Sequence, residues 1–346
     1  MARGDTAGEG PIVTIDPVTD GAARESTNGF WADQHVLVTG GSGFLGTALV
    51  AQLQARGAAA ITVPRSVEYD LRRREDAERL FAETLPDLVI HLAARVGGIG
   101  ANQARPADLY LDNLLMGTYG LDEARVHATP KTVIVGTICS YPKFTPVPFH
   151  EESLWQGYPE ETNAPYGIAK LAQLVQLQAN RDQYGQRAIY LMPTNLYGPG
   201  DKFHPAVSHV IPALVKKCVD AVDLGEDHIE VWGTGSASRE FLYVDDAAEG
   251  IVLAAEHYED AEPVNLGADH EMPIKELVDH VVEATGFKGE VRWDTSRPDG
   301  QPRRRVDASR AKAAFGFEAR TPFVDGLRRT VDWYLAHREE AEARAE

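Results

Sequence analysis

Three glycines stand at fixed spacing between an apolar run and an amphipathic one, in residues 36–46 (Val-Leu-Val-Thr-Gly-Gly-Ser-Gly-Phe-Leu-Gly). Gly40, Gly43 and Gly46 permit a tight turn, close approach of the backbone to a phosphate and close packing of a helix on a strand. The first turn of such a helix carries free N–H groups and a partial positive charge, which bind anions. The segment therefore predicts a strand, a phosphate-binding turn and a helix. It favours dinucleotide binding over a plain glycine-rich turn.

Short apolar runs alternate with longer amphipathic stretches from residue 35 to residue 198. We expect buried strands at residues 36–39, 61–63, 88–93, 132–135 and 188–192, and helices at residues 43–56, 72–84, 107–127 and 166–184. Continuous apolar strands that alternate with helices predict a parallel sheet covered on both faces. The expected fold is therefore α/β, a Rossmann-like doubly wound parallel sheet with a smaller C-terminal α/β substrate-binding lobe.

The regular pattern ends after Gly198, but residues 241–255 and 263–267 still resemble parts of the sheet unit. We therefore expect a discontinuous arrangement of three parts. They are a flexible N-terminal extension at residues 1–29, a dinucleotide-binding unit at 30–198 plus 240–268, and a substrate unit at 199–239 plus 269–346. The extension is rich in Gly, Thr, Asp and Glu, apart from the apolar stretch Ile12 to Ile15.

Composition excludes several classes of protein. No apolar run approaches the ~20 residues that cross a bilayer, and the first residues lack the basic flank and apolar core of a secretion signal. We expect a cytoplasmic protein with no membrane partner. The formal net charge of -18 argues against binding nucleic acid, so a polyanionic ligand must meet local basic residues. The two cysteines, Cys139 and Cys218, imply no disulfide framework, and we predict no metal site.

Tyr166 and Lys170 lie four positions apart at the start of an expected helix, so their side chains share one face. A phenol with a pKa of about 10 is a poor proton donor or base at neutral pH unless a cation stabilises its phenolate. Lys170 supplies that cation, and Thr137, just after the fourth expected strand, adds a hydroxyl for the same substrate oxygen. We interpret these residues as a redox site that moves a proton as hydride moves. A surface helix pair is the alternative.

A residue near the end of the second expected strand selects between the two nicotinamide dinucleotides. An acidic side chain there binds a ribose 2′-hydroxyl, whereas an arginine suits a 2′-phosphate. Arg65 occupies this place and the first carboxylate is Glu68, which favours NADP (NADPH) over NAD. A solvated loop arginine is the other interpretation. Asp70 is expected either to reach the adenine or to cap the helix that follows.

Longer strings in a fixed order carry a family resemblance from about Gln34 to Trp333. The most specific are residues 93–99 (Ala-Ala-Arg-Val-Gly-Gly-Ile), 139–143 (Cys-Ser-Tyr-Pro-Lys), 193–199 (Pro-Thr-Asn-Leu-Tyr-Gly-Pro), 203–205, 208–212, 231–233, 239–241 and 297–300. On these strings the chain resembles the extended short-chain dehydrogenase/reductase family, and within it the branch of the GDP-L-fucose synthases. The resemblance implies NADPH-dependent 3,5-epimerisation and 4-keto reduction of a GDP-4-keto-6-deoxyhexose, giving GDP-L-fucose or a close relative.

The resemblance further implies that a cysteine and a histidine perform the epimerisations while the tyrosine and lysine serve the reduction. The matching positions are Cys139 and His209. A 4-ketone makes the C3 and C5 hydrogens acidic, so one group must remove a proton and the other must return one to the opposite ring face. Thr137 and Tyr166 would hold the enolate oxygen, as an oxyanion hole does. Without the resemblance Cys139 would be interpreted as packing, and Cys218 keeps that interpretation.

The family pattern also implies contacts along the cofactor and the substrate. Cofactor-binding residues are expected at Gly40, Gly43, Phe44, Leu45, Gly46, Arg65, Asp70, Leu92, Ala93, Ala94, Lys170, Pro193, Asn195, Leu196 and His209. The GDP portion is expected to contact Lys217, Trp232 and Arg239, with Asp299 on the sugar or ribose.

Two further features stay open. Arg303, Arg304 and Arg305 form a basic run in an acidic protein, which is either a binding surface or a solvated face. His204 is interpreted equally as a structural residue or as a ligand contact.

Four positions depart from the pattern of that branch. Thr137 and Ile138 stand where two serines are usual, Ser140 replaces an apolar residue, and Arg95 replaces a lysine. Thr137 retains the hydroxyl that reduction requires but narrows the pocket. These changes leave the identity of the sugar open.

Other activities fit the site less well. A nucleotide-sugar 4,6-dehydratase would carry Asp-Glu after Thr137, where this chain has Ile138 and Cys139. Simple 4-epimerisation of a UDP-sugar requires neither thiol nor histidine. The main alternative is a reductase or epimerase of another GDP-hexose or GDP-heptose in antibiotic or polysaccharide biosynthesis. A cofactor-sensing binding protein would usually have lost Tyr166 or Lys170.

Assembly is the last expectation. The helices at residues 107–127 and 166–184 suit the four-helix dimer interface that is common in the family, or they pack on the sheet. The resemblance therefore implies a homodimer that binds a nucleotide-diphosphate sugar.

Overall fold

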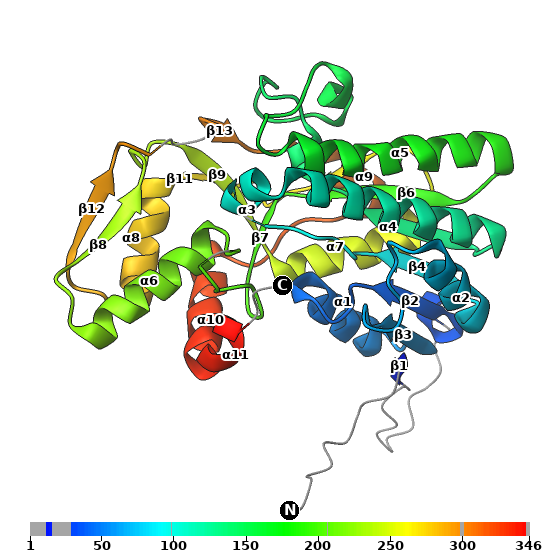
Figure 1. The fold of residues 1–346 in the computed structure, drawn as a ribbon, viewed down its shortest axis with the longest axis horizontal. Coiled ribbons are helices and arrows are strands. Elements are labelled where there is room, and N and C mark those ends of the chain that lie inside the picture. Colours follow the sequence, from blue (N-terminus) through cyan, green and yellow to red (C-terminus); the bar gives the residue numbers. More distant parts are fainter. Residues whose placement is uncertain (1–11, 16–28, 98, 206, 298–300, 344–346) are drawn as a thin grey trace, which may run out of the picture.

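The computed structural model describes residues 12–15, 29–97, 99–205, 207–297 and 301–343. The largest sheet of the protein has seven strands and lies in the right half of Figure 1. The strands are β1 (Ile12–Ile15), β2 (His35–Thr39), β3 (Ala60–Pro64), β4 (Leu88–His91), β5 (Lys131–Val135), β6 (Ala188–Pro193) and β10 (Val264–Leu266). They lie in the order β1-β3-β2-β4-β5-β6-β10, and every neighbouring pair is parallel except β1 with β3.

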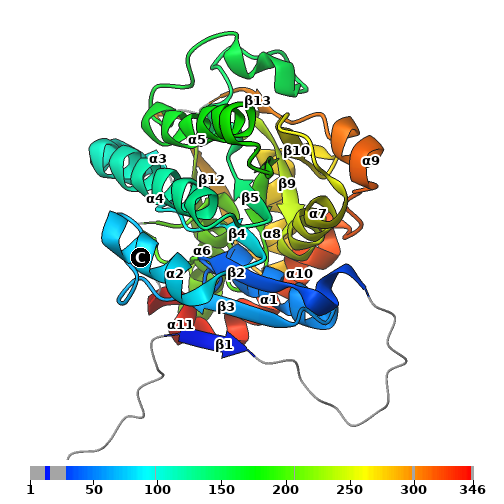
Figure 2. The same ribbon diagram turned by 90° about the vertical axis from the view of Figure 1, so that its right-hand side faces the viewer.

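Helices cover both faces of this sheet, as Figure 2 shows. One face carries α2 (Arg74–Thr84), α4 (Pro106–Val126) and α5 (Ala164–Tyr184), with the short α3 (Ile99–Ala104) beside α4. The other face carries α1 (Phe44–Ala55), α7 (Val244–His257) and α9 (Ser309–Phe315). The predicted Rossmann-like fold, a parallel sheet between two helical layers, is confirmed.

The alternation of side chains along β2 shows how the core forms on both faces. Val36 and Val38 pack in the cluster that contains Leu49 of α1, whereas Leu37 packs on the opposite face in the cluster that contains Phe81 of α2. Because successive strand residues point to opposite sides of a sheet, a strand buried on both faces must be apolar throughout. This is why a continuous apolar run identified each buried strand.

A second, smaller unit stands at the carboxyl end of the main sheet. Its sheet has β9 (Ser238–Tyr243) at the centre, paired with β7 (Asn195–Tyr197), β11 (Glu271–Pro273) and β13 (Arg303–Arg304), and a separate parallel pair joins β8 (His228–Trp232) and β12 (Glu290–Asp294). Its helices are α6 (Val210–Leu224), α8 (Ile274–Thr285), α10 (Phe323–Ala336) and α11 (Arg338–Ala343). Three short 3-10 helices complete the described elements: η1 (Phe30–Asp33), η2 (Ile138–Ser140) and η3 (Glu151–Trp155).

The structure differs from the sequence expectation at the N-terminal extension. Residues 12–15 form β1 and pair antiparallel with β3 over its whole length, so the prediction of a flexible segment was wrong for them. An outermost strand of a sheet presents unpaired N–H and C=O groups, and β1 satisfies those of β3. The other residues of the predicted extension before Gly29 lie outside the described part of the chain.

The division into two units stays a prediction, and two stretches bear on it. Residues 241–243 belong to the second sheet, while α7 directly after them packs on the main one. Phe315 and Phe317, which the predicted boundary assigns to the substrate unit, lie in the core of the main sheet. Among the described helices, none is long and apolar enough to cross a membrane.

Candidate active site

The start of α5 places the predicted redox pair. Pro165 stands in the first turn of the helix, where its fixed φ favours helix initiation and its missing N–H is not needed. Tyr166 and Lys170 then follow on consecutive turns of one face. Lys170 is fully buried, and its ammonium donates to the carbonyl oxygen of Val135 at 2.9 Å. Burial lowers the pKa of Lys170 to about 8.

The phenol of Tyr166 lies beside Thr137 and Cys139. Its pKa is raised above the usual phenol value mainly by burial and further by the nearby charge of Cys139, while the hydrogen bond with the Thr137 hydroxyl lowers it. Tyr166 is therefore a neutral phenol that retains its proton at physiological pH. The structure thus brings three of the five predicted catalytic residues, Thr137, Cys139 and Tyr166, into contact, and Lys170 follows one turn after Tyr166 on the same helix.

The short helix η2 fixes Cys139 against α5. Thr137 is its N-cap residue, and the threonine hydroxyl accepts a hydrogen bond from the N–H of Cys139 at 3.2 Å. Ser140, one of the departures from the family pattern, donates through its hydroxyl to the carbonyl of Gly167 at 2.9 Å. A Cβ at Gly167 would lie 2.4 Å from the carbonyl oxygen of Cys139. Only a glycine after Tyr166 lets the two helices pack this closely.

His209, the fifth predicted catalytic residue, comes from the second unit, where it is the N-cap residue of α6. Its side chain is exposed. The protein around the ring lowers its pKa, mainly by desolvation and secondly through the charge of Lys202. The imidazole is therefore neutral at pH 7. Among the described contacts, no hydrogen bond joins this ring to Cys139.

The turn between β2 and α1 has the predicted form. Gly43 is the N-cap residue of α1 and no side chain caps the helix, so its first N–H groups are available to an anion. A Cβ at Gly46 would lie 2.2 Å from the carbonyl oxygen of Gly40. The hydroxyl of Thr39 accepts a hydrogen bond from the N–H of Ala93 at 3.3 Å, which fixes the loop after β4 beside the turn. This cradle fits the pyrophosphate of a dinucleotide.

The other predicted cofactor contacts lie at the same edge of the sheet. Leu92, Ala93 and Ala94 follow the carboxyl end of β4, and Asn195 and Leu196 follow that of β6, where Pro193 is the last residue. In a parallel sheet the carboxyl ends of all strands meet at one edge, where dinucleotides bind. Their contact with a cofactor stays a prediction.

Arg65 and Asp70 follow β3 at the place that selects the cofactor. Arg65 is exposed, and the described part of the chain provides no ion pair for its guanidinium. The carboxylate of Asp70 accepts hydrogen bonds from the guanidinium of Arg72 at 2.8 and 2.7 Å, and this contact is the main reason why the pKa of Asp70 is lowered. The alternative that Asp70 caps α2 is wrong, because Arg73 is the N-cap residue and no side chain caps that helix. The adenine contact stays a prediction.

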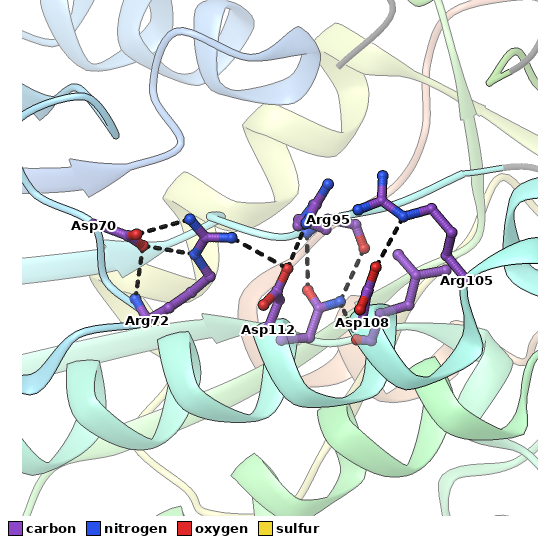
Figure 3. Close-up of polar contacts among 8 residues, drawn as sticks. Asp70, Arg72, Arg95, Arg105, Asp108 and Asp112 are labelled. Carbon is purple, nitrogen blue, oxygen red and sulfur yellow. Dashed lines mark hydrogen bonds and ion pairs between the residues drawn. The ribbon is translucent and has the colours of Figure 1, made fainter.

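A chain of ion pairs leads from Asp70 to the loop after β4, as Figure 3 shows. Arg72 reaches the carboxylate of Asp112 in α4 at 3.5 Å, and the same carboxylate accepts a hydrogen bond from Arg95 at 2.6 Å. The Asn113 side chain accepts from the N–H of Arg95 at 3.0 Å and donates to its carbonyl at 2.9 Å. The arginine that replaces a lysine of the family pattern thus anchors the loop that carries predicted cofactor contacts.

The residues predicted to hold GDP come from three elements of the second unit. Trp232, the last residue of β8, is 62% exposed, and the guanidinium of Arg297 lies 4.9 Å from its ring centroid. An exposed flat ring suits stacking on a nucleotide base. Lys217 of α6 donates to a backbone carbonyl of β8 at 2.5 Å, and Arg239 is half-buried in β9. Asp299 lies outside the described residues.

Arg303, Arg304 and Arg305 do not form one surface. Arg303 and Arg305 each pair with a carboxylate near β11. Arg304 lies between them and points into the site, with Nη1 3.9 Å from the sulfur of Cys139. Successive side chains of a strand point to opposite sides, so neither interpretation of the basic run holds for all three residues. The sequence run could not show which arginine faces the thiol.

Comparison with known proteins agrees with this arrangement. Residues 36–267 match the NAD dependent epimerase/dehydratase family. The chain belongs to this family. Its curated members include GDP-L-fucose synthase 1 of Arabidopsis thaliana, which is 43% identical over 300 residues that cover 87% of this chain and 93% of that protein.

Two solved structures of similar proteins share the fold. A GDP-L-fucose synthetase from Naegleria fowleri bound to NADP is 29% identical and covers 90% of this chain and 96% of that one, with a TM-score of 0.81. A GDP-6-OMe-4-keto-L-xylo-heptose reductase from C. jejuni is 27% identical and covers 89% and 99%, with a TM-score of 0.84.

The epimerase/dehydratase site contains residues that the sequence analysis missed. Gln301 and Asp112 position two arginines, yet neither belongs to a catalytic motif. The sequence offered little to identify them. Gln301 only stands close to the arginine run, and Asp112 only lies in an expected helix. Asp112 binds an arginine 17 residues away, and Gln301 is itself held by the carbonyl of Lys143, 158 residues away, and local patterns do not encode such contacts.

Proposed function

We propose that this member of the epimerase/dehydratase family performs NADPH-dependent 3,5-epimerisation and 4-keto reduction of a GDP-4-keto-6-deoxyhexose, giving GDP-L-fucose or a close relative. The observation that carries the proposal is the thiol of Cys139 beside the hydroxyl groups of Thr137 and Tyr166. Reduction alone requires no thiol, whereas inversion of a carbon next to a ketone requires an acid and a base. The similarity to the Arabidopsis relative, which is named as a GDP-L-fucose synthase, supports the choice of sugar.

In the reduction, Tyr166 gives its phenolic proton to the ketone oxygen at C4. Bound NADPH supplies the hydride. The ammonium of Lys170, one helical turn further along α5, would stabilise the phenolate that remains, and the hydroxyl of Thr137 would hold the same substrate oxygen. Full burial keeps the ammonium of Lys170 away from solvent, and its hydrogen bond to the carbonyl oxygen of Val135 fixes its position.

In each epimerisation one side chain removes the proton of C3 or C5, and the electron pair moves toward the ketone oxygen. A second side chain then returns a proton to the opposite face of the ring. Cys139 and His209 serve as this pair, and their location on different structural units allows them to approach opposite faces. Thr137 and Tyr166 stabilise the enolate oxygen.

Residues of this chain also fit the two nucleotide ligands. The uncapped start of α1 would hold the cofactor pyrophosphate, and the exposed guanidinium of Arg65 would bind the 2′-phosphate of NADPH in preference to NADH. Trp232 would stack on guanine, while Lys217 and Arg239 would meet the GDP diphosphate. The NADP in the Naegleria structure supports the choice of cofactor.

A second candidate is a reductase or epimerase of a different GDP-hexose or GDP-heptose. The similarity to the C. jejuni heptose reductase favours it, as do the departures at Ile138 and Ser140 beside the catalytic thiol. Both candidates use the same redox residues, so the substrate must decide between them.

The test supplies GDP-4-keto-6-deoxymannose and NADPH in heavy water. We expect NADPH oxidation together with deuterium at C3 and C5 of the product. Reduction without deuterium uptake would contradict the epimerase half of the proposal. Absence of NADPH oxidation with this sugar, but turnover of a GDP-4-keto-heptose, would favour the second candidate.

The proposed enzyme is a cytoplasmic homodimer. Helices α4 and α5 pack against each other, and both keep apolar side chains on their outer surface, including Leu111 and Val175, each 50% exposed. Pairing of these helices with those of a second copy would remove this apolar surface from water.

A further inference from the structure

A guanidinium reaches the catalytic thiol from a distant part of the chain. Nη1 of Arg304 lies 3.9 Å from the sulfur of Cys139, across a sequence separation of 165 residues. The pairing of β13 with β9 brings it there, with Arg304 opposite Arg239 in the parallel register. The family pattern described above assigns this arginine no role in catalysis.

The orientation of Arg304 is fixed by a second side chain. The amide oxygen of Gln301 accepts hydrogen bonds from Nε at 3.2 Å and from Nη2 at 2.9 Å. Gln301 in turn donates to the carbonyl of Lys143 at 2.7 Å, in the loop that follows η2. One edge of the guanidinium is therefore occupied, and the remaining nitrogen points at the sulfur.

The thiol faces titratable groups from two elements. Helix α5 presents Tyr166; Lys170, one turn further along, donates instead to a backbone carbonyl of β5. The β13 segment presents Arg304. After burial, the charge of Cys139 is the next largest cause that raises the pKa of Tyr166, which shows that the sulfur and the phenol lie close together. A guanidinium stays charged at every physiological pH and offsets the charge on sulfur.

We propose that Arg304 is a positioning residue that holds Cys139 as a thiolate, so that the sulfur removes the proton from the carbon next to the ketone. This inference deepens the proposed function and rests on it for the substrate. In the step the C–H bond breaks, the S–H bond forms, and the electron pair moves to the ketone oxygen held by Thr137 and Tyr166. The thiol then releases its proton to solvent, which restores the ion pair.

The test measures the rate of alkylation of Cys139 by iodoacetamide as a function of pH, with each peptide resolved by mass spectrometry. Only the thiolate reacts, so the pH of half-maximal rate reports how readily the thiolate forms. For Arg304→Gln we expect this midpoint to rise by at least ~1 pH unit, a roughly tenfold loss of thiolate near neutrality. Arg304→Lys keeps the charge and should shift the midpoint less.

Two references control the measurement. Arg303→Gln removes the adjacent guanidinium, which pairs with Glu271 and faces away from the thiol, and it should leave the midpoint unchanged. Cys218 is fully buried and burial raises its pKa to about 11, so it should stay unreactive in every variant. If Arg304→Gln does not fold, Gln301→Leu retains the guanidinium but releases its orientation, and it should raise the midpoint by a smaller amount.

An unchanged midpoint in Arg304→Gln, or an equal shift in Arg303→Gln, would overturn the inference. If the Kd for GDP were also tenfold weaker in Arg304→Gln, Arg304 would serve the diphosphate instead of the thiol. The alkylation requires no sugar, so its outcome is independent of the proposed function. Failure of GDP-4-keto-6-deoxymannose to turn over would contradict the proposed function alone.

A second readout connects the ion pair to catalysis. In Arg304→Gln, uptake of deuterium from heavy water should fall at least tenfold, and raising the pH should restore part of it. Reduction of an already epimerised ketone should change little, because it requires no thiolate. Equal losses in the two reactions would contradict a role through Cys139.

Discussion

Two cysteines in this chain show how surroundings decide the chemistry of a residue. Cys218 packs in the core of the second unit, where burial raises the pKa of its thiol to about 11. Cys139 is partly exposed and lies between a phenol and a guanidinium. The same side chain is therefore an inert packing group in one place and a candidate base in the other.

Substitution of Cys139 by serine separates the two proposed half-reactions. A serine hydroxyl does not ionise near neutral pH, so proton exchange at C3 and C5 should fall by at least ~100-fold, the size of a general acid–base contribution. Reduction of an already epimerised ketone should fall by much less. Deuterium uptake and NADPH oxidation measure the two rates, with Cys218→Ser as the matched control. Equal losses in both assays would count against the assigned role of Cys139.

The pH profile of reduction should reflect Lys170. Because burial lowers its pKa to about 8, Lys170 carries its charge below that pH and loses it above. The cation that stabilises the Tyr166 phenolate is thus present on the acid side, and kcat for reduction should decline as the pH rises through 8. Steady-state rates at saturating NADPH and ketone provide the measurement. An arginine stays charged over this pH range, so Lys170→Arg should show low activity without the decline. If the decline persisted in this variant, the titration of a group other than Lys170 would cause it.

At the scale of elements, close contact between η2 and α5 sets the geometry of the site. The two helices meet where Gly167 faces the carbonyl of Cys139 and Ser140 donates to the carbonyl of Gly167. Since Tyr166 is the neighbour of Gly167, the same contact determines how the phenol and the thiol lie relative to each other.

Gly167→Ala should disturb this contact. Its Cβ would lie 2.4 Å from a backbone oxygen, which cannot move away as a flexible side chain can, so we expect a loss of about 1–3 kcal/mol in the free energy of unfolding. Both half-reactions should slow together. Urea unfolding and the two assays test this. Gly100→Ala is the control, because nothing lies within 4 Å of its Cβ position, and an equal effect there would show a general cost of alanine.

Local patterns predicted the elements well and the contacts between them poorly. The glycine spacing around Gly43 and the apolar runs identified the strands and helices of the main sheet to within about two residues, because each is encoded by adjacent residues. The spacing of Tyr166 and Lys170 likewise indicated a shared face. The approach of Arg304 to Cys139 depends on the pairing of β13 with β9, which no local pattern specifies. For β1, a four-residue stretch with three apolar side chains in a polar segment did not reveal which strand it would join.

At the scale of the whole molecule, the outer surface of α4 and α5 is the surface proposed to form the dimer. Leu111 on α4 and Val175 on α5 are each half exposed, although the two helices lie side by side on the sheet (Figure 1). Exposed apolar groups on adjacent helices are typical of a surface that is buried in an oligomer.

Leu111→Glu should therefore dissociate the proposed dimer. Placing a carboxylate in an apolar interface without a partner is strongly unfavourable, so the variant should elute as a monomer at micromolar concentration. Light scattering coupled to size-exclusion chromatography measures the mass. Val324→Glu, at a residue of α10 with 52% exposure, is the control and should leave the mass unchanged. A monomeric wild-type protein would contradict the proposed assembly.

The second unit is assembled from three separate stretches, β7 to β9, β11 to β13 and α10 to α11, and α9 returns to the main sheet between the last two. During synthesis, the core of the main sheet cannot be completed before Phe317 has left the ribosome, and the core of the second unit cannot be completed before Tyr334 has. A single proteolytic cut cannot separate the units into two folded fragments. We expect the chain to unfold in one cooperative transition, with the two units unable to survive independently.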